Sequence, residues 1–274
     1  MCSELFTATD ADVVLRTSDN VQFRVYHHIL SEASPFFKDL FSLPQGDLAD
    51  STVAPIVDVS ESAEVMEGIL RLIYPKQDPV INSLDELSPL LAAATKYDIV
   101  RATETLRRLL VSPRFVEKEP TRVYAIACRH DLEAEARVAS KHTLRINILD
   151  CPLSDDLKHI TAWSYHRLLD LHRQRSKAAQ AVLDEAITSA DDVKCMQCSS
   201  SHYGSLCPPR WWTEFATRAK EELRVRPTSD VIFTVAFLVE SSRTGCQRCA
   251  GSILESHAFL ERVKSRINEL PSTI

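Results

Sequence analysis

Hydrophobic and polar residues near the start of the chain follow the pattern of two paired strands. An apolar run at 13–15 and a second run at 21–25 are separated by the polar segment 17–20. The second run alternates apolar and polar residues, as a strand with one buried face requires. Because Asp-Asn between two such runs is typical of a tight turn, the sequence predicts a β-hairpin over residues 12–25.

Helical spacing follows the hairpin. A short helix is expected to end at Ile29-Leu30-Ser31, and Ser34 can cap the next helix with Pro35 at its first position. Four large apolar residues then share one face of that helix: Phe36, Phe37, Leu40 and Phe41.

Residues 55–97 predict one more strand and several helices. The strand is expected at 55–59, and a helix capped by Ser60 is expected to end at Tyr74-Pro75. Ser83 and Glu86 have the spacing of a capping box. Pro89 is expected to begin a second short helix over 90–97.

This order of hairpin, short helix and Ser-Pro-Phe-Phe resembles the start of a BTB (POZ) domain. The resemblance implies an α+β fold over residues 8–112, in which a small sheet is capped by helical hairpins. It also implies that the protein binds other proteins, or a second copy of itself, and is not an enzyme. Members that recruit a cullin ubiquitin ligase often carry a hydrophobic-x-Glu motif where this chain has Leu43-Pro44-Gln45. Only 11 residues precede Asp12, which argues against the strand exchange that builds many BTB dimers.

A weak internal repeat marks the next segment. Residues 94–99 and 127–132 share the pattern Ala-x-basic-ring-Asp-aliphatic, which predicts two helical hairpins in which each Asp caps the following helix. In BTB proteins the second hairpin often begins a helical extension called BACK, and residues 113–190 look similar to one. Its main helix is expected over 165–189. A basic stretch on it is expected to be a solvated face: His166, Arg167, His172, Arg173, Arg175 and Lys177.

Residues 191–274 are expected to form a helical, Cys-rich region. One helix should contain Trp211 and Trp212 and stop at Pro227. A buried helix is expected over 231–239, with Asp230 helping to cap it. The last helix is expected over 251–270, with Leu254 on its apolar face.

Two paired thiol motifs lie in this region, Cys195/Cys198 and Cys246/Cys249. A tetrahedral zinc ion needs two such pairs, so the four residues are the expected metal ligands, with zinc as a structural ion because no coordination position stays open. His202 or Cys207 could replace one ligand. Free buried thiols and a redox-active dithiol are the alternatives. Fungal BTB proteins often carry a similar series of Cys-x-x-Cys, Trp-Trp, Arg-Pro and Cys-x-x-Cys.

Composition narrows the choice of function. Five glycines in 274 residues favour helix and leave no phosphate loop, and no catalytic motif is found. The net charge of −6 argues against nucleic acid as the main partner. No signal peptide or membrane span is found, so the cytoplasm or the nucleus is expected, with reduced cysteines.

The leading hypothesis is therefore a protein-interaction module or adaptor with a zinc-clamped C-terminal half. A substrate adaptor of a cullin-type ubiquitin ligase and a DNA-binding transcriptional regulator are the alternatives.

Overall fold

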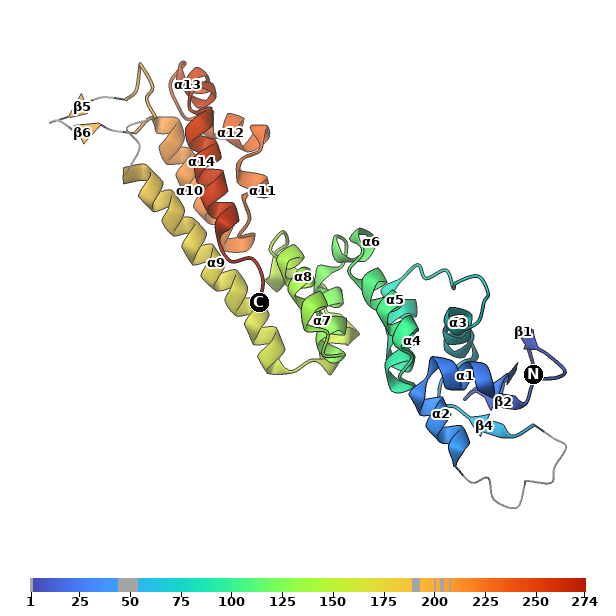
Figure 1. Ribbon diagram of the computed structural model, residues 1–274. Helices are drawn as coiled ribbons and strands as arrows, with labels where there is room; N and C mark the ends of the chain where they lie inside the picture. Colours follow the sequence, from blue (N-terminus) through green and yellow to red (C-terminus); the bar gives the residue numbers. More distant parts are fainter. Residues whose placement is uncertain (1, 44–53, 189–192, 200, 203–204, 207) are drawn as a thin grey trace. The chain divides into compact units, whose positions relative to one another are not determined.

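The computed structural model describes residues 2–43, 54–188, 193–199, 201–202, 205–206 and 208–274. The chain forms two compact units, residues 1–119 (unit 1) and residues 120–274 (unit 2). A small sheet with helices makes up unit 1, and unit 2 is almost entirely helical (Figure 1). The expected α+β fold with a mainly helical C-terminal region is confirmed.

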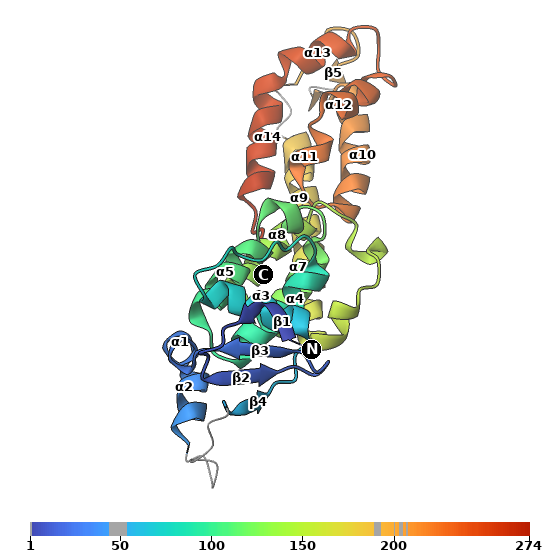
Figure 2. The same ribbon diagram turned by 90° about the vertical axis from the view of Figure 1, so that its right-hand side faces the viewer.

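The sheet of unit 1 has four strands in the order β1-β3-β2-β4 (Figure 2). Their bounds are β1 Cys2–Thr7, β2 Val13–Arg16, β3 Gln22–Val25 and β4 Ile56–Asp58. Strands β2 and β3 are antiparallel, whereas β1 pairs with β3 and β4 pairs with β2 in parallel. The predicted hairpin is confirmed: Thr17 N–H donates to the Val21 carbonyl at 3.0 Å, and Asn20 takes a positive φ of 61° in the turn. The sequence did not predict β1.

Six helices of unit 1 are described: α1 His27–Ala33, α2 Pro35–Ser42, α3 Ala63–Ile73, α4 Leu84–Lys96, α5 Val100–Leu110 and α6 Pro113–Val116. Helices α1 and α2 pack as one hairpin and α4 and α5 as another. The predicted cap is confirmed, because Ser34 Oγ accepts from Phe37 N–H at 3.1 Å; the same hydroxyl donates to the Tyr97 carbonyl at 2.5 Å. One buried serine thus joins the two hairpins.

Helix α4 differs from its prediction. Ser83 caps it, and the Glu86 carboxylate reaches back to Asn82 N–H at 2.9 Å, one residue before the cap. Pro89 lies inside the continuous helix rather than starting a second one, so that prediction was wrong. Pro89 removes one hydrogen bond, but Leu87, Leu90 and Leu91 on the buried side of α4 hold the helix together through packing.

Unit 2 contains eight described α-helices: α7 Pro120–Arg129, α8 Glu133–Thr143, α9 Ala162–Thr188, α10 Arg210–Val225, α11 Ser229–Ile232, α12 Val235–Ser242, α13 Cys249–Glu255 and α14 His257–Glu269. Two short 3-10 helices precede α9, η1 Ile148–Asp150 and η2 Asp155–His159, and β5 Ser201–His202 pairs with β6 Ser205–Leu206. Helices α10 and α14 pack against α9, whose length was predicted to within a few residues.

Two predicted helices of unit 2 are divided in the structure. Thr234 caps α12 through its side chain, so residues 231–239 form parts of two short helices, and Val235 is 77% exposed rather than buried. Thr228, not Asp230, caps α11 with its side chain. Residues 251–270 likewise break at Ser256 between α13 and α14, which leaves Leu254 79% exposed.

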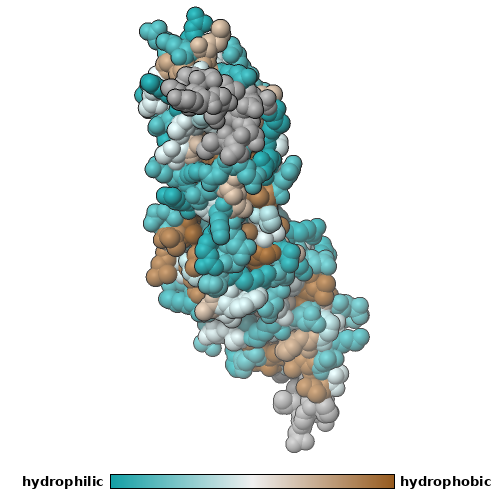
Figure 3. All heavy atoms as spheres, turned by 90° about the vertical axis from the view of Figure 1, so that its left-hand side faces the viewer, coloured by the Kyte–Doolittle hydropathy of each residue, from teal (hydrophilic) through white to brown (hydrophobic). Residues whose placement is uncertain are grey.

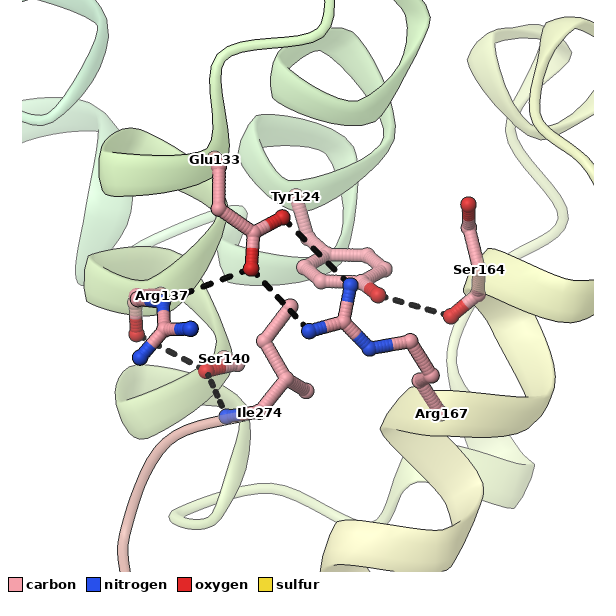
Figure 4. Close-up of polar contacts among 7 residues, drawn as sticks. All are labelled: Tyr124, Glu133, Arg137, Ser140, Ser164, Arg167 and Ile274. Carbon is pink, nitrogen blue, oxygen red and sulfur yellow. Dashed lines mark hydrogen bonds and ion pairs between the residues drawn. The ribbon is translucent and has the colours of Figure 1, made fainter.

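Polar contacts join α7, α8 and α9 (Figure 4). The Glu133 carboxylate lies between two guanidinium groups, 3.0 Å from Arg167 and 3.3 Å from Arg137. Tyr124 Oη donates to the Ser164 carbonyl at 2.7 Å, and burial raises the pKa of that phenol well above its usual value. Arg167 hydrogen-bonds Glu133 and thereby lowers the pKa of the Glu133 carboxyl.

The basic stretch on α9 is not one solvated face. Arg175 is buried and donates to four backbone carbonyls, those of Pro227, Ile267, Leu270 and Pro271. Three of these lie where α14 ends. The cation provides donors for the Leu270 and Pro271 carbonyls and shares the Ile267 carbonyl with Leu270 N–H. His172 is also buried, and its Nε2 lies 3.0 Å from Thr143 Oγ1. The prediction was therefore wrong for these two residues.

Among the described residues, no helix is long and apolar enough to cross a membrane.

Candidate metal centre

Two tight turns of unit 2 present the four paired cysteines. The first turn follows α9: Ser199 N–H donates to the Cys195 carbonyl at 3.0 Å, and Cys195 N–H donates to Ser199 Oγ at 2.9 Å. The second turn leads into α13: Cys249 N–H donates to the Cys246 carbonyl at 3.0 Å, and Cys246 N–H donates to Cys249 Sγ at 3.3 Å. Each turn directs its two sulfurs to the same side.

The four sulfurs converge although more than 45 residues separate the turns. Cys195 Sγ lies 3.4 Å from Cys246 Sγ, and Cys198 Sγ lies 3.6 Å from Cys249 Sγ. Cys246 and Cys249 have their sulfurs 3.7 Å apart, and all four lie within 4.8 Å of one another. A tetrahedron of sulfurs around zinc, with bonds near 2.3 Å, has edges of about 3.8 Å. The sulfur positions fit a tetrahedral metal ion.

The first turn of α10 points its backbone amides at two of these sulfurs. The Arg210 amide acts to lower the pKa of Cys198, and the Trp211 amide acts to lower the pKa of Cys249, although burial outweighs both effects. Pro209 precedes the helix and gives it no side-chain cap. Both amides belong to the start of α10, where the positive end of the helix dipole favours the ionised form of a nearby sulfur.

Three thiols of the cluster have pKa values that are shifted in different directions. Burial raises the pKa of Cys195, but the backbone amides of Gln197 and Cys198 offset this and lower it to about 7. Burial and the neighbouring sulfurs raise the pKa of Cys198 to about 12, and burial also raises the pKa of Cys249. Four thiolates this close repel one another, so full ionisation of the cluster needs a cation among them.

Gly245 is a part of the site that sequence analysis missed. A Cβ atom at this position would lie 2.5 Å from Cys249 Sγ and 2.7 Å from Cys249 Cβ. Only a residue without a side chain lets the backbone pass this close to the sulfur. A glycine directly before Cys246, in a chain with five glycines, was the available signal.

Ser252 holds the two cysteine segments on the core, and it was also missed. Its hydroxyl accepts from Trp211 Nε1 at 3.0 Å and donates to the Lys194 carbonyl at 2.9 Å. Helix α13, the start of α10 and the residue before Cys195 are thereby joined. No local pattern in the sequence identifies this serine, since its partners are 41 and 58 residues away.

The apolar core beneath the cluster is built from α9, α10 and α14. Cys195 and Cys249 are buried against Trp211, Trp212 and other apolar side chains of that core. Trp212 stacks on Phe215, with ring centroids 5.3 Å apart. The site therefore lies between the hydrophobic core and the two turns, where a bound ion would fasten both turns to the helices.

The other two candidate ligands cannot be placed. Cys207 and the side chain of His202 lie outside the described residues. Among the described residues, the four cysteines are the one group of His, Cys, Asp or Glu side chains close enough together to hold a metal ion.

Comparison with known proteins concerns unit 1. The family model for the BTB/POZ domain matches residues 2–113. No curated protein matches the chain. The matched range contains the four-stranded sheet and both helical hairpins of unit 1. The chain therefore carries a BTB/POZ domain over residues 2–113.

Proposed function

We propose that this protein is an adaptor that binds other proteins, through the BTB/POZ domain of unit 1 and through a second surface on unit 2. The observation that carries the proposal is the BTB/POZ match over residues 2–113, because such domains in general mediate contacts between proteins and are not enzymes. On this proposal the protein itself is not an enzyme, and it acts in the cytoplasm or the nucleus.

An open groove on unit 1 supports protein binding. It has a volume of about 740 Å³ and is lined by one side of α1, by the end of α3 and by the start of α5. Ile29 and Ala33 of α1 line it, and Val100 of α5 is 56% exposed beside them. Covering an exposed aliphatic side chain in a concave surface removes apolar area from water, which favours binding of a partner.

The substitution Val100→Glu tests the role of unit 1. A carboxylate at the first residue of α5 is compatible with the helix dipole, so the fold should persist while the groove loses an apolar contact. Sedimentation velocity would measure self-association, and quantitative crosslinking in cell extract would measure partners that crosslink to unit 1. We expect Val100→Glu to weaken one of these associations about tenfold or more. Val138→Glu, at a 41% exposed position of α8 in unit 2, is the matched control.

Two results together would contradict the proposal. The chain would stay monomeric, and Val100→Glu would leave the crosslinking of every partner to unit 1 unchanged. A cullin among the captured proteins would support the ubiquitin-ligase alternative. The motif position that bears on this alternative, Pro44 and Gln45, lies outside the described residues. Retention of DNA that weakens with salt would instead support a transcriptional regulator.

For unit 2 we propose a structural zinc ion bound by Cys195, Cys198, Cys246 and Cys249. The sulfur spacing of 3.4–3.7 Å supports zinc, and the four cysteines leave no open position for a substrate. We also propose that residues 113–190 serve as a BACK-like region and that residues 191–274 form the zinc-binding region, as in the fungal type of BTB protein.

A further inference from the structure

A groove along α9 has features that neither the BTB/POZ domain nor the cysteine cluster explains. It has a volume of about 780 Å³, is open to solvent, and lies entirely within unit 2. Its walls include the turn 147–149 and the end of α10 at Arg224 and Val225. The floor is the face of α9 between His166 and Asp184.

The groove is long enough for a helix. One face of α9 lines it from end to end, with His166, Leu169, Arg173, Lys177, Gln180 and Asp184 among the lining residues. The 18-residue separation from first to last corresponds to about 27 Å of helix. A long, open groove of this kind suits an amphipathic helix laid along it. Such a helix contacts its groove through residues at positions i, i+3, i+4 and i+7.

Apolar side chains line parts of the groove. Leu149 is 78% exposed and Val225 is 40% exposed, on two separate wall segments, and Leu169 lies half-buried on the floor. Figure 3 shows one face of the molecule, on which hydrophilic side chains predominate and apolar ones gather only in small patches. The two exposed wall residues would lose contact with water if a partner helix placed apolar side chains between them.

The charges of the groove are unbalanced. The two acids that line it already have basic partners, since Asp170 pairs with Arg173 and Asp184 pairs with Lys220. Lys177 and Arg224 remain, both exposed and with no acidic partner among the described residues. Lys177 on α9 and Arg224 on α10 are thus two uncompensated cations in a groove that also holds apolar side chains, in a protein whose net charge is −6.

We propose that this groove binds an amphipathic helix of a partner protein that carries Asp or Glu beside its apolar face. The apolar side chains of the helix pack between Leu149 and Val225, and its carboxylates pair with Lys177 and Arg224. Complementary charge sets which helix binds and its orientation more than the total affinity. This inference rests on the proposed role of unit 2 as a second protein-binding surface.

The test uses the full chain and two synthetic helical peptides of 18 residues. Both peptides have the same leucine face; one carries glutamates beside it and the other carries lysines. We expect the glutamate peptide to bind about tenfold more tightly in fluorescence anisotropy, with a difference that shrinks as salt is raised. Hydrogen exchange should show protection at 147–149, 166–184 and 224–225.

Charge-reversed variants test whether the groove causes the preference for the glutamate peptide. In Lys177→Glu/Arg224→Glu the preference between the two peptides should be lost or reversed. The matched control, Arg108→Glu/Lys118→Glu, makes the same change in net charge at exposed positions of unit 1 outside its groove and should leave the preference intact.

Several results would overturn the proposal. These are equal binding of both peptides, no binding of the glutamate peptide at millimolar concentration, or protection outside the groove. Self-association that Lys177→Glu/Arg224→Glu abolishes would make a second copy of the chain the occupant. Binding to phosphatidylserine vesicles that the same variant abolishes would make it a membrane surface. None of these results bears on associations measured through Val100, so the role of unit 1 is tested separately.

Discussion

At the scale of single residues, the cysteine cluster requires a residue without a Cβ atom at position 245. We expect Gly245→Ala to push Cys249 out of position, because the added Cβ would lie 2.5 Å from its sulfur. Overpacking of this kind typically costs about 1–3 kcal/mol. Zinc affinity measured by competition with a chromogenic chelator should fall at least tenfold.

Gly251 provides the control for that substitution. A Cβ there meets nothing within 4 Å, and the residue lies inside α13. Gly251→Ala should therefore keep the zinc affinity and stabilise the protein by about 0.5–1 kcal/mol through helix propensity. If both variants bound zinc like the parent, the close approach at Gly245 would not matter for the site.

The repeated Asp positions have a different role from the one predicted. Asp98 and Asp131 take positive φ angles of 49° and 54° and end the preceding helix. In each case the next residue closes the turn: Ile99 N–H donates to the Ala94 carbonyl and Leu132 N–H to the Ala127 carbonyl, both at 2.9 Å. This is a Schellman motif, so the prediction that Asp caps the following helix was wrong.

The left-handed backbone at Asp98 predicts how substitutions at this position change the free energy of unfolding. Asp98→Gly should raise the free energy of unfolding by about 0.5–1 kcal/mol, because glycine takes this conformation without a steric penalty. Asp98→Ala should lower it, since alanine carries the penalty without a polar side chain to offset it. Urea denaturation monitored by circular dichroism distinguishes them, and equal effects of Gly and Ala would show that φ is not the cause.

At the scale of elements, the sequence indicated where helices and strands lie better than where they break. Ser34, Ser83 and Pro227 mark ends that the structure confirms, because caps and prolines act on their immediate neighbours. Thr234 and Ser256 divide hydrophobic patterns that look continuous: Thr234 caps α12 with its side chain, whereas Ser256 precedes α14 without a side-chain cap. The four cysteines could be predicted as a group from spacing, whereas Ser252 and the start of α10 join the site only through the fold.

Helix α9 contains a buried histidine that links stability to pH. Burial lowers the pKa of His172 to about 4, from an ordinary value of 6.5. The unfolded chain therefore binds the proton more readily, so His172 destabilises the folded state as pH falls from 6.5 to 4 and has no further effect below 4. The full effect is about 3 kcal/mol.

We expect His172→Gln to remove this pH dependence while a polar group remains near Thr143. Loss of metal from thiolates also destabilises unit 2 in acid, so the informative quantity is the difference between the parent and His172→Gln. Relative to its own value at pH 7, the variant should lose less free energy of unfolding at pH 4.5 than the parent does. Parallel pH profiles for the two proteins would contradict the assignment.

At the scale of the whole molecule, all four cysteines belong to unit 2, whereas the BTB/POZ domain lies in unit 1. Metal loss should therefore act on one unit only. In zinc-binding domains the free energy of metal binding contributes directly to folding. Ser252 and the core beneath the two turns at Cys195 and Cys246 also hold these turns together.

Metal analysis with Cys246→Ser tests this separation. The parent should contain about one zinc per chain, and the variant should contain none. Since each kcal/mol lost lowers the Tm of a domain of this size by about 2–4 °C, the loss of several kcal/mol should lower the Tm of unit 2 by about 10 °C. Hydrogen exchange should increase in residues 193–274 and stay unchanged in residues 5–110.

Cys151→Ser is the control. It removes a half-buried thiol outside the cluster and should change neither the zinc content nor the Tm by a comparable amount. A metal-free parent of equal stability would leave the four sulfurs as buried thiols, and equal deprotection of both units would show that they do not fold independently.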